Sequence, residues 1–134
     1  MDELPHWERG TPALLCVAGQ HAIPISTAVR VDGLRVAFAL GGWRETLRLL
    51  REDPAASVSI LGRGLAFTAY GPARVARESM RSSPGVVGME LAVERLEDHL
   101  ADGRTEMLNG ARWGWRDDRA AADYPALLEE LENL

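Results

Sequence analysis

The sequence predicts a mainly β protein with short helices, folded as a small barrel. Alternating and continuous apolar runs of strand length recur along the chain, separated by glycine, proline and aspartate turns. Helical periodicity is confined to about 43–52 and to a tail from about 117. With 134 residues and no long linker, the chain has the length of one domain. We therefore expect about six strands, one inserted helix and one terminal helix.

The first apolar run, residues 13–19, lies between Pro12 and Gly19. Its length is typical of a buried strand rather than a helix. Cys16 lies inside this run and is therefore interpreted as a core thiol.

The clearest hairpin signal is Asp32-Gly33, which separates two alternating runs. A two-residue turn with positive φ fits this pair. That register places Val29 opposite Val36 and Arg30 opposite Arg35, the second of which is unfavourable. The other face carries small residues, which leave room for a flat ligand or simply form a half-buried strand: Ser26, Ala28, Ala37 and Ala39.

The inserted helix over about 43–52 has Trp43, Leu47 and Leu50 at core spacing. Arg44, Arg48 and Arg51 repeat on another of its faces, and Asp53-Pro54 ends it.

Further strands are expected over about 56–62, 65–76 and 86–96. Gly71-Pro72 predicts a bulge or an edge position in the second of them. In the tail, Asp117 or Asp118 caps the helix, and Pro125 marks a break or a second start.

Composition excludes several function classes. All 15 basic residues are arginine and the net charge is -5, so the basic excess of nucleic-acid-binding proteins is missing. A Schiff-base lysine is excluded, and the single cysteine excludes an intrachain disulfide. No apolar run approaches ~18 residues, so we expect a cytoplasmic protein without a membrane segment. The spacing of Asp98, His99, Asp102 and Glu106 fits no ligand pattern, and no metal site is predicted.

Several short segments, in order and spacing, resemble one family. They are Pro24-Ile25-Ser26-Thr27, Val31-Asp32-Gly33, Phe38-Ala39, Leu50-Arg51-Glu52-Asp53-Pro54 and Ala69-Tyr70-Gly71-Pro72-Ala73-Arg74-Val75. The chain is thereby similar to the pyridoxamine 5'-phosphate oxidase-like, FMN-binding split β-barrel superfamily over about residues 12–116. The resemblance implies a six-stranded split β-barrel, followed here by a helical tail at 117–134. It also implies a homodimer with FMN or a deazaflavin in an inter-subunit cleft.

The sequence departs from the family at the cofactor phosphate. Where the family commonly has an Arg-Lys pair, this chain has Glu45 and Thr46. Arg44, Arg48 and the Thr46 hydroxyl are candidate replacements, assisted by the backbone N–H groups of Gly41-Gly42. The alternative is a solvated arginine face paired with Glu45 and Glu52.

Two segments complete the site that the resemblance implies. Ser26 and Thr27 match the strand along the flavin ring, and Trp113 to Arg116 match a region that reaches the partner's cofactor. The tryptophans serve equally well for dimer packing. The predicted cofactor-binding residues are Ser26, Thr27, Ala28, Gly41, Arg44, Thr46, Leu47, Arg48, Trp113 and Arg116.

Three functions stay open: a flavin- or deazaflavin-dependent oxidoreductase, a non-catalytic binder of such a cofactor, and a cofactor-free dimeric split barrel. FMN is expected rather than FAD, because there is one candidate phosphate nest and no Gly-x-Gly-x-x-Gly motif. No catalytic residue is predicted.

Overall fold

The computed structural model describes residues 1–134 and contains eight strands and two helices. The mainly β class and the C-terminal helix are confirmed, with eight strands in place of the six expected. In chain order they are β1 (Ala13–Val17), β2 (His21–Ile25), β3 (Val29–Asp32), β4 (Arg35–Gly41), α1 (Glu45–Glu52), β5 (Ala55–Gly62), β6 (Leu65–Arg77), β7 (Val86–Ala92), β8 (Arg95–Asp98) and α2 (Asp118–Glu132).

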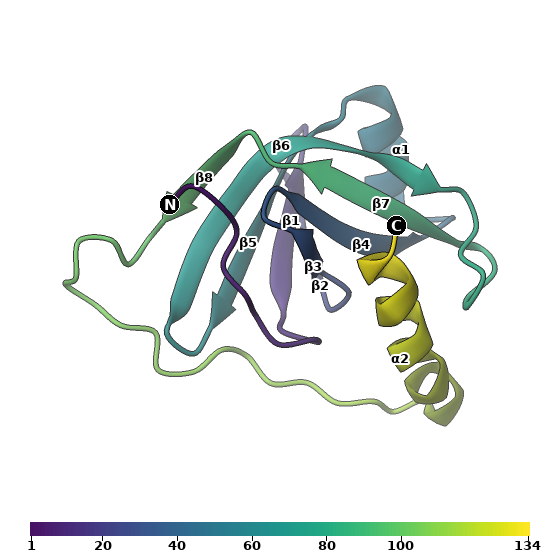
Figure 1. The fold of residues 1–134 in the computed structure, drawn as a ribbon. Helices are drawn as coiled ribbons and strands as arrows, with labels where there is room; N and C mark the ends of the chain where they lie inside the picture. The colour runs from purple at the N-terminus through teal and green to yellow at the C-terminus, as the bar shows by residue number, and fades with distance from the viewer.

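The strands form one curved antiparallel sheet in the order β2-β1-β5-β6-β7-β4-β3, with β8 on β6 (Figure 1). The two end strands, β2 and β3, follow each other in the chain and are joined by residues 26–28. The barrel is therefore split at this short connection. The expected strand over 86–96 is divided, because the Val93 N–H turns to the Leu34 carbonyl and the Glu94 N–H to that of Tyr70.

The interior of the barrel is filled by one apolar cluster that includes the fully buried Leu15, Phe38, Val58 and Phe67. Val87, Met89 and Leu91, which alternate along the strand expected over about 86–96, are buried. Cys16, by contrast, is half-buried on the outer face of β1, because only every second residue of that strand points inward. The prediction of a core thiol was wrong.

The hairpin differs in register from the prediction. Val29 pairs with Ala37, Arg30 with Val36 and Asp32 with Arg35, with a bulge after Arg30. The turn is centred one residue later than expected, because the Asp32 side chain accepts the Leu34 N–H at 2.9 Å. Arg35 thereby lies beside carboxylates, with its Nε 2.7 Å from Asp32, and the expected clash between arginines does not occur.

The small residues of this hairpin accommodate a helix. Ala37 is buried in a second apolar cluster with Val29, Met80, Leu128 and Leu131, and Ala39 packs against it. Figure 1 shows α2 lying beside β4, at the end of a long linker that starts after β8. The space over Ala37, which the sequence left open to a flat ligand, is therefore filled by α2.

The two helices match their predictions in part. Leu47 and Leu50 are buried as expected, but α1 begins only at Glu45, and Trp43 is 84% exposed in the turn before it. Asp117 caps α2 through bonds from the Arg119 and Ala120 N–H groups. Pro125 neither breaks nor restarts α2, because burial of Leu128 and Leu131 on the next turns stabilises the continuous helix.

Gly71-Pro72 marks a change of partner on one side of β6. On this side β6 pairs with β8 over Phe67–Tyr70 and with β7 from Ala73 onward, while its pairing with β5 on the other side ends at Pro72. A Cβ at Gly71 would lie 1.8 Å from the Ala92 carbonyl oxygen, so only glycine fits. The bulge itself lies further on, between Val75 and Arg77.

Neither helix combines the length and the apolarity needed to span a bilayer.

Candidate functional site

The split between β2 and β3 contains a cavity of about 180 Å³, called here the split cavity. Its lining brings together four of the predicted site residues, which come from the connection, the end of β4 and the turn before α1. These four are Ser26, Thr27, Gly41 and Arg44. Pro24, Ile25, Ala39 and Leu40 complete the lining.

The strand connection that lines this cavity is held on two sides. Thr27 Oγ1 accepts the Ala39 N–H at 3.0 Å, which ties the connection to β4. The Tyr124 hydroxyl of α2 donates to the Ser26 carbonyl. The cavity wall is therefore fixed by β4 and by the C-terminal helix together.

The arginines around α1 are not equivalent. Arg48 forms ion pairs with Glu45 and, at 2.8 Å, with Glu52, and Arg51 pairs with Glu78 at 2.8 Å. The hydrogen bond from Arg48 lowers the pKa of Glu45 below its usual value. Arg44 is half-buried, lines the cavity and forms no ion pair. Arg44 is thus the one cation of this group that is free to meet an anionic ligand.

Two further predicted residues of α1 lie away from the cavity lining. Thr46 is buried, with its Oγ1 2.9 Å from His21 Nε2, and Leu47 belongs to the barrel core. The predicted backbone nest is also partly occupied, because the Gly42 N–H donates to the Gly85 carbonyl at 3.0 Å. The sequence interpretation of a solvated, paired face therefore describes Arg48 and Arg51, and Arg44 stands apart from them.

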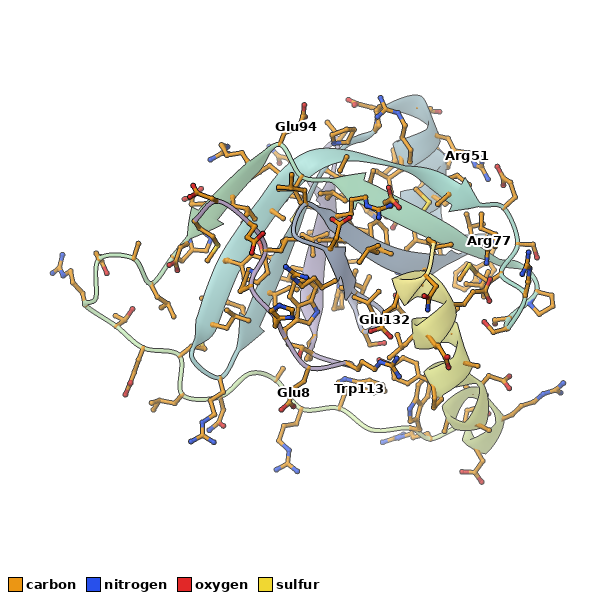
Figure 2. The ribbon with its side chains drawn as sticks, viewed as in Figure 1. Glu8, Arg51, Arg77, Glu94, Trp113 and Glu132 are labelled. Carbon is orange, nitrogen blue, oxygen red and sulfur yellow. The ribbon has the colours of Figure 1, made fainter.

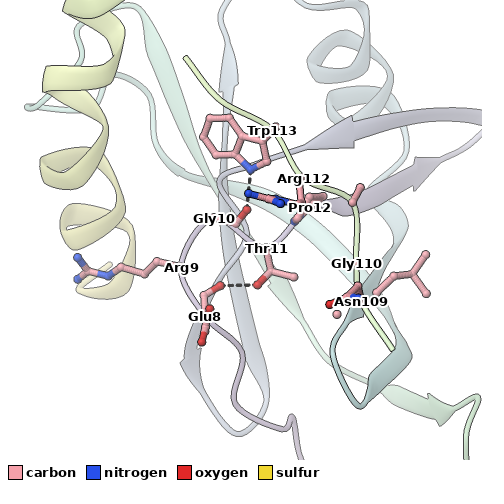
Figure 3. A pocket seen from close by; sticks show the side chains of 12 residues that line it. Glu8, Arg9, Gly10, Thr11, Pro12, Asn109, Gly110, Arg112 and Trp113 are labelled. Atoms are coloured by element: carbon pink, nitrogen blue, oxygen red, sulfur yellow. Dashed lines mark hydrogen bonds between the residues drawn. The ribbon is translucent and has the colours of Figure 1, made fainter. Parts of the chain in front are cut away.

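Ala28 and the Trp113–Arg116 segment are placed elsewhere. Ala28 is buried in the core, and its carbonyl accepts the Trp7 indole N–H at 3.0 Å. Trp113 lies in the linker beside the N-terminal part of α2 and donates to the Gly10 carbonyl at 2.8 Å (Figures 2 and 3). It lines a separate polar cavity of about 320 Å³ between residues 8–12 and 109–113. Arg116 is exposed and forms no ion pair.

A third cavity, of about 310 Å³, was not predicted from the sequence, and we call it the helix cavity. It shares Ser26 and Thr27 with the split cavity and is otherwise lined by Ser83, Trp115 and the first half of α2. Burial raises the pKa of Tyr124, one of its lining residues, while the hydrogen bond to Ser26 opposes this shift. The sequence indicates the helix, but only the docking of α2 on β3 and β4 brings Tyr124 to Ser26.

Two of the three histidines, His21 and His99, lie in hydrogen-bonded pairs with threonines. Besides the pair of His21 and Thr46, His99 Nε2 lies 2.7 Å from Thr68 Oγ1, which lies 2.7 Å from Ser59 Oγ. These hydrogen bonds link the exposed turn just past the end of β8 to β6 and β5. The structure gathers no three metal-ligating side chains in one place.

Comparison with known proteins finds its matches among solved structures. No family model matches the sequence. No curated protein matches it either.

Three solved structures illustrate the likeness. A protein described as a putative pyridoxamine 5'-phosphate oxidase from Listeria innocua is 19% identical with a TM-score of 0.54, over 66% of this chain and 88% of that one. A FAD-binding protein from Mesorhizobium loti is 15% identical with a TM-score of 0.50, over 63% and 81%. An F420 reductase is 13% identical with a TM-score of 0.51, over 67% and 91%. The chain therefore has the fold of the pyridoxamine 5'-phosphate oxidase-like split β-barrels.

Proposed function

We propose that this chain binds the phosphate of a flavin or deazaflavin cofactor in the split cavity, with Arg44 as the principal anion ligand. The observation that carries this proposal is the contrast between Arg44 and its neighbours. Arg48 and Arg51 are neutralised by carboxylates, whereas Arg44 lines the cavity unpaired. An unpaired guanidinium in a half-buried site offers a bidentate fork that fits a phosphate.

The size of the split cavity limits what it holds. Small-molecule sites usually measure about 300–1,000 Å³. At about 180 Å³, the split cavity has room for the phosphate end of FMN but not for the whole molecule. A whole cofactor therefore needs walls beyond this cavity.

A second copy of the chain would supply one such wall. The helix α2 packs on β3 and β4, whereas on the outer face of β2, β1 and β5 the side chains of Leu14 and Leu61 are 42% and 40% exposed. Pro24 pairs with Leu14 and also lines the split cavity, so this face and the cavity adjoin. We propose a homodimer through this face, with Trp113 and Arg116 available for contact with the partner.

When bound, a flavin supplies hydride chemistry while the protein orients it. The split cavity itself contains no carboxylate, histidine or cysteine to act as an acid or base. NAD(P)H oxidation by the holoprotein separates an oxidoreductase from a non-catalytic binder.

The experiment is an FMN titration followed by flavin fluorescence. Arg44→Ala should weaken FMN binding about ten- to a hundred-fold, because a charge-assisted hydrogen bond contributes about 1.5–3 kcal/mol. Arg48→Ala is the matched control and should change the affinity less than about three-fold, since Arg48 is already paired. Equal affinities for wild type and Arg44→Ala would place the phosphate elsewhere.

The cofactor-free alternative is favoured by Glu45, which stands where the family has a basic residue. Wild-type protein that binds neither FMN nor a deazaflavin phosphate would support that alternative. FAD bound more tightly than FMN would contradict the choice of a mononucleotide.

A further inference from the structure

The split cavity and the helix cavity have the strand connection in common. Ser26 and Thr27 line both, although the remaining lining residues of the two cavities differ. Thr27 faces Ala39 of β4, and Tyr124 of α2 reaches the Ser26 carbonyl. One ligand lying across this connection would therefore touch both cavities at once.

The two cavities differ in chemistry. The split cavity ends at the single cation Arg44. The helix cavity has the aromatic rings of Trp115 and Tyr124, whose centroids are 5.0 Å apart. Trp113 packs edge-on against both rings without itself lining the helix cavity. A ligand that suits both cavities carries an anionic group at one end and a planar ring at the other.

The polar residues of the helix cavity fit the edge of such a ring. Arg119 and Asp123 line it, and neither forms an ion pair. Guanidinium N–H groups match ring carbonyls, and a carboxylate matches a ring N–H. The pyrimidine edge of a flavin or deazaflavin presents both kinds of group side by side.

We propose that α2 forms the ring-binding half of the cofactor site. The phosphate lies at Arg44, the chain of the cofactor crosses Ser26–Thr27, and the ring lies against Trp115 and Tyr124 with its pyrimidine edge toward Arg119 and Asp123. This inference rests on the proposed function and extends it. It assigns to the C-terminal helix a role in selecting ligands with a planar ring.

The test compares FMN with riboflavin, which has the same ring without the phosphate. Trp115→Ala and Asp123→Asn should each weaken both ligands about five- to fifty-fold, whereas Arg44→Ala should weaken FMN alone. Trp115→Phe, which keeps a ring, should restore most of the affinity. Glu129→Gln is the matched control for Asp123→Asn, because it removes one exposed charge from the same helix outside the cavity.

The outcomes separate the two proposals. If Arg44→Ala weakens FMN but Trp115→Ala and Asp123→Asn leave both ligands unchanged, the phosphate site stands and the ring site on α2 is refuted. If the wild-type chain binds neither FMN nor riboflavin, the proposed function itself fails. Circular dichroism of Trp115→Ala and Trp115→Phe checks that α2 stays folded. The Asp123→Asn titration tests the ring site without changing the packing of Trp113, Trp115 and Tyr124.

Discussion

Two outer faces of the barrel differ in whether α2 covers them. The face of β3 and β4 is covered by α2, which buries Leu128 and Leu131 against Val29 and Ala37. The outer face of β2, β1 and β5, called here the bare face, leaves Leu14 exposed. The connection at Ser26–Thr27 runs from one face to the other. Its residues line both the split cavity and the helix cavity.

An ion pair and hydrogen bonds also hold α2 on the barrel. The carboxylate of Glu130, whose side chain is 12% exposed, pairs at 2.6 Å with Arg77, which lies beside the C-terminal end of α2 in Figure 2. It also accepts the N–H groups of Arg81 and Ser82 and the Ser82 hydroxyl. One face is thus covered within the chain, while the other leaves Leu14 and Leu61 exposed, where we propose that the partner packs.

The largest expected effect distinguishes the two faces by stability. Leu131→Ala should lower the free energy of unfolding by about 2–5 kcal/mol, because it removes a fully buried side chain. Leu14→Ala, at an exposed position of the same residue type, should cost less than about 1 kcal/mol in the monomer. Urea denaturation of both variants measures the difference. Equal losses of unfolding free energy in the two variants would mean that packing of α2 stabilises the fold no more than the exposed side chain of Leu14 does.

The second prediction concerns Glu130. Burial raises the pKa of this carboxyl, but the bonds from Ser82, Arg81 and Arg77 outweigh it and lower the pKa to about 2. A depressed folded-state pKa stabilises the fold above the ordinary value and loses that effect as the pH falls toward about 2. Glu130→Gln should therefore cost about 2 kcal/mol near neutral pH and progressively less in acid. Urea midpoints of this variant and of the control Glu129→Gln, followed from neutral to acidic pH, test this prediction. A deficit independent of pH would contradict it.

The third prediction targets the bare face. Leu14→Arg should leave the fold of the monomer intact, because the side chain points to solvent, but should prevent the proposed dimer by burying an unpaired charge. Light scattering at micromolar concentration should show a dimer for wild type and a monomer for the variant. A monomeric wild type would refute the dimer.

The smallest expected effect is at the anion site. Glu45→Arg removes the partner of Arg48 and adds a cation near the cavity, so it should tighten FMN binding about two- to five-fold. The measurement is the same fluorescence titration, repeated at high salt, which should abolish the gain. Weaker binding by this variant would show that the pair of Glu45 and Arg48 orders the site.

The sequence was sufficient to predict part of the local structure. The alternation of Val87, Met89 and Leu91, the cap at Asp117 as one of two candidates, and the burial of Leu47 and Leu50 were confirmed, since each depends on neighbours in the chain. Trp43, predicted on the same core face, is exposed instead. The predicted hairpin register was wrong, because the Asp32 side chain accepts the Leu34 N–H and the turn lies one residue later. The position of α2 on the barrel could not be predicted either, because it depends on residues far apart in the chain. The helix occupies the space over Ala37, and its Tyr124 reaches Ser26. For the site, the sequence pointed to Ser26, Thr27, Gly41 and Arg44, which do gather around one cavity.

The central claim is that the cofactor lies across the connection between the two faces. Titration of FMN into ¹⁵N-labelled protein, followed through the backbone amide signals, tests it most directly. The account predicts the largest shifts at Ser26, Thr27, Gly41 and Arg44, with a second group at Trp115 and Asp123. Shifts confined to the strands β5, β6 and β8, or no shifts at saturating FMN, would contradict it.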